Sequence, residues 1–268
     1  MLQTFFVASI NAHLAYRYRP GTQSPIVILH GIGGSSIEEY APLFDRADLE
    51  GWPILAIDLL GFGHSDKPEA FAYSLGAQAD TIASLFKALG LSPAIILGHS
   101  LGGSLAMIFA KSYPELVRAL IMAEAGLEFK YLVLSRWASH YKEEVFASQF
   151  ETLMSGTAGG ILGGFSTQPT MKMTNAIAFY RTSVSLIAAA KGDVLLADFY
   201  SSHLWKTFWI GEKTRDRYGD AFLQELDRRG ISWSLLKGAG HQLILEQPAH
   251  FGVLLADFVR ALPGDQTT

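Results

Sequence analysis

The sequence predicts an α/β domain built around a mostly parallel sheet, and three observations support this. First, short continuous apolar runs occur at 26–29, 54–57, 95–97 and 120–123, and such runs are typical of strands that are covered on both faces. Second, helical stretches separate these runs, as in βαβ units. Third, glycine-containing turns follow the first three runs, and an open parallel sheet binds its ligands at such turns.

The remaining elements are placed by periodicity and turn residues. Segments 3–8 and 13–19 mix polar and apolar residues around a short turn, so we expect an antiparallel hairpin at one edge of the sheet. The clearest helix covers 77–89, where apolar side chains recur at helical spacing and Gly90 ends the pattern. Further elements are expected as a strand over 207–210, a helix over 216–229, a strand over 232–236 and a helix over 247–262.

The segment after Gly126 breaks this rhythm. Residues 127–195 contain no strand-like run, which predicts a mostly helical cap inserted into a core made of residues 1–126 and 196–268. A disordered surface loop within the core domain is the alternative. The glycine-rich stretch 156–164 predicts a flexible part of the cap. The segment is rich in aromatic residues, namely Phe129, Tyr131, Trp137, Tyr141, Phe146, Phe165, Phe179 and Tyr180.

Composition excludes several classes of function. The 268 residues carry a formal net charge of -4 without a basic run, so the chain has no electrostatic footprint for nucleic acid or an anionic membrane. The absence of cysteine excludes a disulfide scaffold, a thiolate metal site and a cysteine nucleophile. The N-terminus lacks the basic region of a secretory signal, and no 18 apolar residues run together. We therefore expect a cytoplasmic protein; its oligomeric state is not predicted.

The most informative motif is Gly98-His99-Ser100-Leu101-Gly102, which joins a predicted strand to a predicted helix. A serine between glycines on such a sharp turn, a nucleophile elbow, is held in a strained conformation that exposes its hydroxyl. Small residues are needed on both sides because the strand and the helix nearly touch there. The motif predicts Ser100 as a nucleophile for acyl transfer.

Two other turns share the rim of the predicted sheet with Ser100. A dinucleotide-binding loop is disfavoured, because the third glycine of its fingerprint is replaced by Ser36 in one turn and by Asp66 in the other. An acyl-transfer site fits better. The backbone amide of Leu101, at the start of a helix, and that of Ile32, in the first turn, would form the oxyanion hole.

The serine needs a general base, and His241 is the best candidate among eight histidines. It lies in the small-residue loop Gly238-Ala239-Gly240-His241, after the last predicted strand and before the last helix. This position places it on the same rim as Ser100.

Through these motifs the chain resembles the α/β-hydrolase superfamily, in particular its capped, esterase-like members, over nearly its full length. The resemblance implies an acid after the strand at 207–210, but the usual aspartate position holds Thr214. Some members take the acid from the preceding strand of the sheet, where this chain has Glu124. We expect Glu124 to complete a catalytic triad, with Glu212 and Asp216 as the alternatives.

The resulting expectation is a serine hydrolase that needs no cofactor and no metal and cleaves a small-molecule carboxylic ester or lactone with a small to medium apolar acyl part. Carbon-carbon bond hydrolases and cofactor-free peroxidases of the same superfamily are the nearest alternatives. Epoxide hydrolases and haloalkane dehalogenases are disfavoured, because that class has an aspartate where Ser100 stands. A non-catalytic ligand-binding protein on this fold is an alternative of another class, suggested by Thr214 alone.

Overall fold

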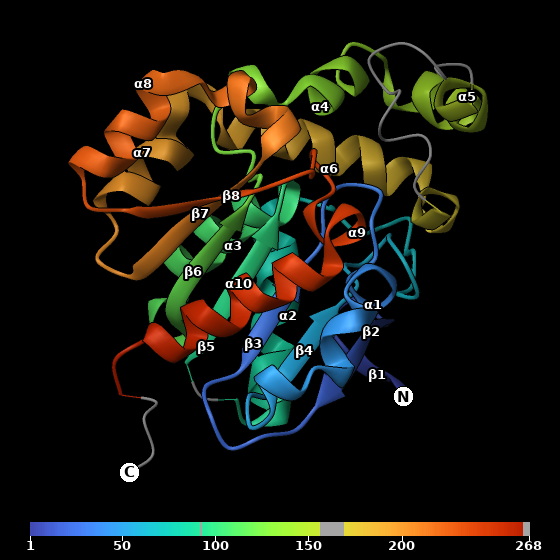
Figure 1. Ribbon diagram of the computed structural model, residues 1–268. Helices are drawn as coiled ribbons and strands as arrows, with labels where there is room; N and C mark the ends of the chain where they lie inside the picture. The colour runs from blue at the N-terminus through green and yellow to red at the C-terminus, as the bar shows by residue number, and fades with distance from the viewer. Residues whose placement is uncertain (92, 156–168, 265–268) are drawn as a thin grey trace.

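The computed structural model describes residues 1–91, 93–155 and 169–264. An eight-stranded sheet with the order β1-β2-β4-β3-β5-β6-β7-β8 forms its centre (Figure 1). The antiparallel pairs are β1 with β2 and β2 with β4, and all other neighbours are parallel. The predicted mostly parallel sheet with an N-terminal edge hairpin is thus confirmed. The strands are β1 Leu2–Val7, β2 Ala12–Arg19, β3 Ile26–Leu29, β4 Ile54–Ile57, β5 Ala94–His99, β6 Val117–Ala123, β7 Trp205–Gly211 and β8 Ser232–Leu236.

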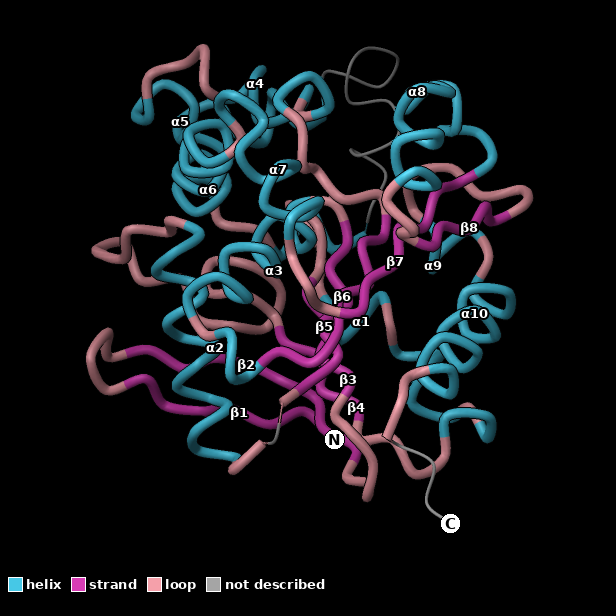
Figure 2. The backbone as a smooth tube through the Cα atoms, turned by 90° about the vertical axis from the view of Figure 1, so that its left-hand side faces the viewer, coloured by secondary structure: helices cyan, strands magenta, loops and turns pink. Residues whose placement is uncertain are grey.

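Helices cover both faces of the sheet: α2 and α3 lie on one face and α10 on the other (Figure 2). None of the helices in the described part of the chain is long and apolar enough to cross a lipid bilayer. The helices are α1 Ser36–Glu39, α2 Leu75–Leu89, α3 Leu101–Ser112, α4 Val133–Ala138, α5 Glu143–Ser155, α6 Ala176–Ala189, α7 Val194–Ser201, α8 Arg215–Arg228, α9 Leu243–Glu246 and α10 Pro248–Ala261.

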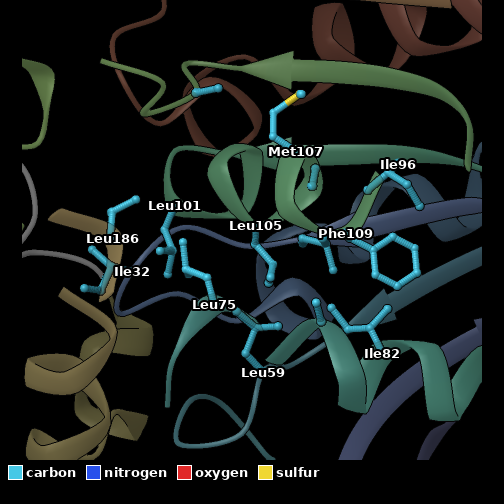
Figure 3. Packing of buried hydrophobic residues seen from close by; sticks show 14 of the residues in the cluster. Ile32, Leu59, Leu75, Ile82, Ile96, Leu101, Leu105, Met107, Phe109 and Leu186 are labelled. Atoms are coloured by element: carbon cyan, nitrogen blue, oxygen red, sulfur yellow. The ribbon is translucent and has the colours of Figure 1, made fainter. Parts of the chain in front are cut away.

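The continuous apolar runs of the strands follow from this layering. Successive side chains of a strand point to opposite faces, so Ile28 packs on the α10 side while Leu29 packs on the α3 side. On the α3 side, Leu105 and Phe109 pack against Ile82 of α2 (Figure 3). All three side chains are buried, and each contributes roughly 1.5–3 kcal/mol by leaving water.

Helices α4, α5, α6 and α7 lie between β6 and β7 in the chain, and α4 to α6 lie above the carboxyl ends of the central strands (Figure 1). α5 packs on α6 through aromatic rings, with Phe146 and Phe179 stacked at 5.7 Å between ring centroids. α7, which follows α6, packs against α3 instead. The glycine-rich stretch 156–164, predicted to be flexible, lies outside the described residues.

Candidate active site

The turn between β5 and α3 holds Ser100 in a conformation that side chains rarely adopt. Its φ is 52° and its ψ is -113°, which lies outside the ordinary regions of backbone space. A side chain at Gly98 would overlap the carbonyl of Gly102, and one at Gly102 would overlap the carbonyl oxygen of Leu29. The glycines are therefore required by close backbone packing around the serine.

His241 lies in the loop between β8 and α9, and it is held from two directions. Its Nδ1 lies 3.1 Å from Oε2 of Glu124. Its carbonyl oxygen accepts a hydrogen bond of 2.8 Å from Nε2 of His99, whose ring centroid lies 4.9 Å from that of His241. Burial and the neighbouring His241 lower the pKa of His99 to about 3, so His99 stays neutral and can keep this donor role.

Glu124 immediately follows β6 and is the carboxylate that meets His241. It too has a positive φ, 49°. Oε1 accepts hydrogen bonds from the amide of Gly211 at 2.8 Å and from the hydroxyl of Thr214. Oε2 accepts one from the Tyr218 hydroxyl at 3.2 Å, on the same oxygen that faces His241. Burial opposes ionisation of Glu124, but the hydrogen bonds and charge of His241, with the Thr214 and Gly211 donors, outweigh it and lower its pKa.

The two alternative acids are held elsewhere. Oε2 of Glu212 accepts a hydrogen bond of 2.9 Å from the amide of Gly238. The side chain of Asp216 is 96% exposed and faces Arg215. Of the three carboxylates considered from the sequence, Glu124 is the one that the fold brings to His241.

Thr214 and Tyr218 are site residues that the sequence did not reveal as such. Thr214 looked like an empty acid position, yet its hydroxyl bonds to the acid on the neighbouring strand. Tyr218 lies in α8, and the sequence placed it only within the helix predicted over 216–229. The unusual Gly-Glu-x-Thr turn was the only sequence signal that pointed to this network.

One cavity joins the candidate residues. Ser100, Glu124 and His241 line it together, and its volume is about 40 Å³. Ile32 and Leu101 border the same space, and Leu101, Ile32 and Leu186 gather at one end of the packed core (Figure 3). Within the described residues, the amides of Ile32 and Leu101 donate no backbone hydrogen bond. In the described part of the chain these two amides thus lack a backbone acceptor, and their residues border the cavity of the candidate nucleophile.

The loop that carries Ile32 is braced from below. Nε2 of His30 accepts a 3.0 Å hydrogen bond from the Leu59 amide, and its Nδ1 lies 2.7 Å from the Gly31 carbonyl. The buried carboxylate of Glu39 accepts hydrogen bonds from the Ser35 amide at 3.1 Å and from the Thr170 hydroxyl at 3.0 Å. Burial raises the pKa of Glu39 to about 7. Thr170 precedes α6, so this carboxylate ties the loop to the segment between β6 and β7.

Side chains that could bind a metal ion are not clustered in the described part of the chain. Across residues 1–91, 93–155 and 169–264, no three His, Asp or Glu side chains are grouped so that they could hold a metal ion. The groups that border the cavity include the hydroxyl of Ser100, the imidazole of His241, the carboxylate of Glu124 and the guanidinium of Arg217.

Comparison with known proteins identifies the family to which this fold belongs. Residues 24–229 match the alpha/beta hydrolase fold family, which is more than half of the chain. The chain therefore belongs to the α/β-hydrolase family. This confirms the resemblance that the glycine-containing turns indicated.

A relative found by its sequence matches a smaller part of the chain, whereas solved structures match nearly all of it. Lipase 3 of Moraxella sp. is 35% identical over 106 residues, which are 39% of this chain and 33% of the lipase. The chain thus spans about a third of the length of that relative. Among solved structures, a carboxylesterase of Nitrososphaera gargenis has a TM-score of 0.75 at 19% identity, covering 96% of this chain and 98% of the other. The N-acyl homoserine lactonase AidH has a TM-score of 0.72 at 19% identity, covering 100% of this chain and 99% of the other. At these identities the two structures show a shared fold.

Proposed function

We propose that this protein is a serine hydrolase of small-molecule carboxylic esters or lactones, acting through an acyl-enzyme. The observation that carries the proposal is the 3.1 Å contact between Glu124 and His241 on the cavity that Ser100 also lines. A carboxylate, an imidazole and a strained serine around one cavity are the three groups that acyl transfer to serine requires. Likeness to a lipase, a carboxylesterase and a lactonase points to the same reaction class.

In this mechanism Ser100 attacks the carbonyl carbon and His241 accepts the hydroxyl proton. His241 then donates that proton to the leaving alcohol. Water next attacks the acyl-enzyme while His241 accepts its proton, and His241 returns a proton to the oxygen of Ser100. Glu124 accepts the hydrogen bond from Nδ1 of His241, which fixes the ring and stabilises its positive charge. The lowered pKa of Glu124 keeps this carboxylate ionised for the task.

The negative charge that develops on the carbonyl oxygen needs donors. The unused amides of Ile32 and Leu101 supply them, and the N-terminus of α3 adds its positive dipole. Each such donor is worth roughly 3 kcal/mol in the transition state. The bracing of the Ile32 loop by His30 and Glu39 holds one donor in place before the substrate arrives.

The described parts of the segment 127–195 act in this proposal as a lid over the site. Side chains from Leu132 to Ser135, with Leu186 of α6, line the cavity beside Ser100. A volume of about 40 Å³ is far below the roughly 300 Å³ of a typical ligand site. We expect these side chains to move aside when substrate enters, and the apolar ones among them favour an apolar acyl group.

The test is hydrolysis of p-nitrophenyl esters of graded chain length by the purified protein. We expect the activity to depend on Ser100, so that Ser100→Ala lowers kcat by at least about 10⁴-fold. The matched control is Ser84→Ala, because Ser84 lies exposed on α2 and, among the described residues, bonds only to the Asp80 carbonyl. Activity that survives Ser100→Ala, or a folded protein with no activity on any ester or lactone, would contradict the proposal. The latter result would favour a binding protein on the same fold.

A further inference from the structure

A cationic side chain borders the cavity beside the candidate nucleophile. Arg217, in the first turn of α8, lines the same cavity as Ser100 and His241. It is the only Lys or Arg among the described residues that line this space. The helix is broken just beyond it, at Gly219, whose φ of 76° and ψ of 165° are not helical. This break separates the first turn, which carries Arg217 and Tyr218, from the rest of α8.

The guanidinium of Arg217 is held in place but not neutralised. One Nη donates to the carbonyl oxygen of Tyr131, and the guanidinium carbon lies 5.5 Å from the centre of the Tyr131 ring. These contacts fix the side chain while leaving its other N–H donors unused within the described residues. Among the described residues, no carboxylate forms an ion pair with the guanidinium of Arg217.

Glu124, the carboxylate that borders the same cavity, does not form an ion pair with Arg217. Its two oxygens are occupied by the donors of Gly211, Thr214, Tyr218 and His241. A half-buried guanidinium beside apolar side chains is costly to desolvate without a counter-charge. The cavity thus holds one guanidinium that is paired with no carboxylate of the described residues.

We propose that Arg217 binds a carboxylate group of the substrate, so that the preferred substrate is an ester or lactone that also carries a free carboxylate. The planar fork of a guanidinium matches a carboxylate in a bidentate pair, and such charge-assisted hydrogen bonds are about twice as strong as neutral ones. The cavity then combines an apolar side, from Leu132 to Leu134 and Leu186, with one cationic anchor. This inference rests on the proposed esterase function and narrows its substrate class.

The test compares two esters that differ only in charge. The mono-4-nitrophenyl ester of fumaric acid carries a carboxylate, whereas 4-nitrophenyl fumaramate carries a neutral amide of nearly the same size. The trans double bond keeps the carboxylate away from the ester, so it cannot assist hydrolysis within the molecule. The quantity measured is the ratio of kcat/KM for the carboxylate ester to kcat/KM for the amide ester.

For the wild-type protein we expect this ratio to be about tenfold above that of Arg217→Met, because a charge-assisted pair is lost. Arg217→Lys should keep an intermediate ratio, since it keeps the charge without the fork. The matched control is Arg215→Met: Arg215 begins the same helix but pairs with Asp216 and Asp220. Its ratio should equal that of the wild type.

Three results would overturn the inference. If both esters are hydrolysed in a Ser100-dependent way and Arg217→Met keeps the wild-type ratio, Arg217 does not select a carboxylate, and the proposed esterase function stands. If Arg215→Met lowers the ratio as much as Arg217→Met does, the preference for the carboxylate ester comes from the overall positive charge at the start of α8 and not from a contact with Arg217. If the wild-type protein hydrolyses neither these esters nor the simple p-nitrophenyl series, the proposed function fails and the inference fails with it.

Discussion

Two neighbouring turns of the molecule each hold a candidate catalytic residue at a positive φ, but the two residues are held in different ways. Ser100 follows β5 with a φ of 52°, and Glu124 follows β6 with a φ of 49°. The strands pair in parallel, with His99 opposite Ala123, so the two turns lie side by side at one edge of the sheet. A strained residue of this kind costs of order 1–3 kcal/mol and persists only where its surroundings enforce it.

The Ser100 turn is enforced by close backbone packing. Its flanking glycines meet other backbone atoms, so no side chain fits there. At the second turn, polar contacts hold the side chain of Glu124, through the amide of Gly211 and the side chains of Thr214, Tyr218 and His241. The comparison shows that the first turn depends on glycines close to Ser100 in the sequence. The side chain at the second turn is held in part by residues that lie 87 to 117 positions later in the chain.

The largest effect that bears on the comparison is expected for Glu124→Gln. The amide keeps the shape but cannot stabilise a charged His241, so kcat should fall by about 10²–10⁴-fold while the protein stays folded. The measurement is kcat on the best p-nitrophenyl ester, with circular dichroism to monitor folding. The control is Glu212→Gln, whose carboxylate bonds to the Gly238 amide. Near wild-type activity for Glu124→Gln, or a larger loss for Glu212→Gln, would show that the acid lies elsewhere.

Gly102→Ala tests the packing that holds the Ser100 turn. The new methyl group would overlap the carbonyl of Leu29, and backbone atoms cannot yield as a side chain does. We expect the free energy of unfolding to fall by about 3 kcal/mol, measured by urea denaturation. The matched control is Gly76→Ala, also within a helix, where a Cβ meets nothing within 4 Å. That variant should be up to about 1 kcal/mol more stable, because alanine is the better helix former. Equal stabilities of the two variants would refute the packing argument.

A smaller effect is expected when one polar support of the second turn is removed. Thr214→Val deletes a hydrogen bond to Oε1 of Glu124 while keeping the size of the side chain. We expect kcat/KM at neutral pH to fall by about tenfold or less, the value of one hydrogen bond to a charged group.

The same variant makes a prediction about pH. His241 and the donors of Thr214 and Gly211 lower the pKa of Glu124. The ionised acid is therefore present above that pKa and is lost as the pH falls through it. Without the Thr214 donor this pKa rises. The acidic limb of the kcat/KM profile should therefore move to higher pH in Thr214→Val. An unchanged profile together with unchanged kcat/KM would mean that Thr214 contributes packing alone.

Much of the fold could be predicted because its signals are local. The apolar runs at 26–29, 54–57, 95–97 and 120–123 all lie within observed strands, since a strand covered on both faces must be apolar throughout. Boundaries were less exact where capping decides them. α2 begins at Leu75, two residues before the predicted start, because the Ser74 hydroxyl accepts a hydrogen bond from the Ala77 amide and caps the helix.

The site was predictable only in part. The Ser100 motif and the loop of His241 carry local signals, and Glu124 could be chosen only with Glu212 and Asp216 left open. Tyr218 and Arg217 carried no signal, because they lie in a helix whose break at Gly219 is visible only in three dimensions. Contacts between residues about a hundred positions apart depend on the sheet order, which short-range patterns do not encode.

The most direct test of the proposed mechanism is labelling with a fluorophosphonate, which reacts with a serine activated by a neighbouring base. The folded protein is labelled first and then digested, and the labelled residue is located by mass spectrometry of the peptides. The proposed mechanism predicts one label per chain, on Ser100, with none in Ser100→Ala and a greatly reduced labelling rate in Glu124→Gln. A label on another residue, or wild-type labelling of Ser100→Ala, would contradict it.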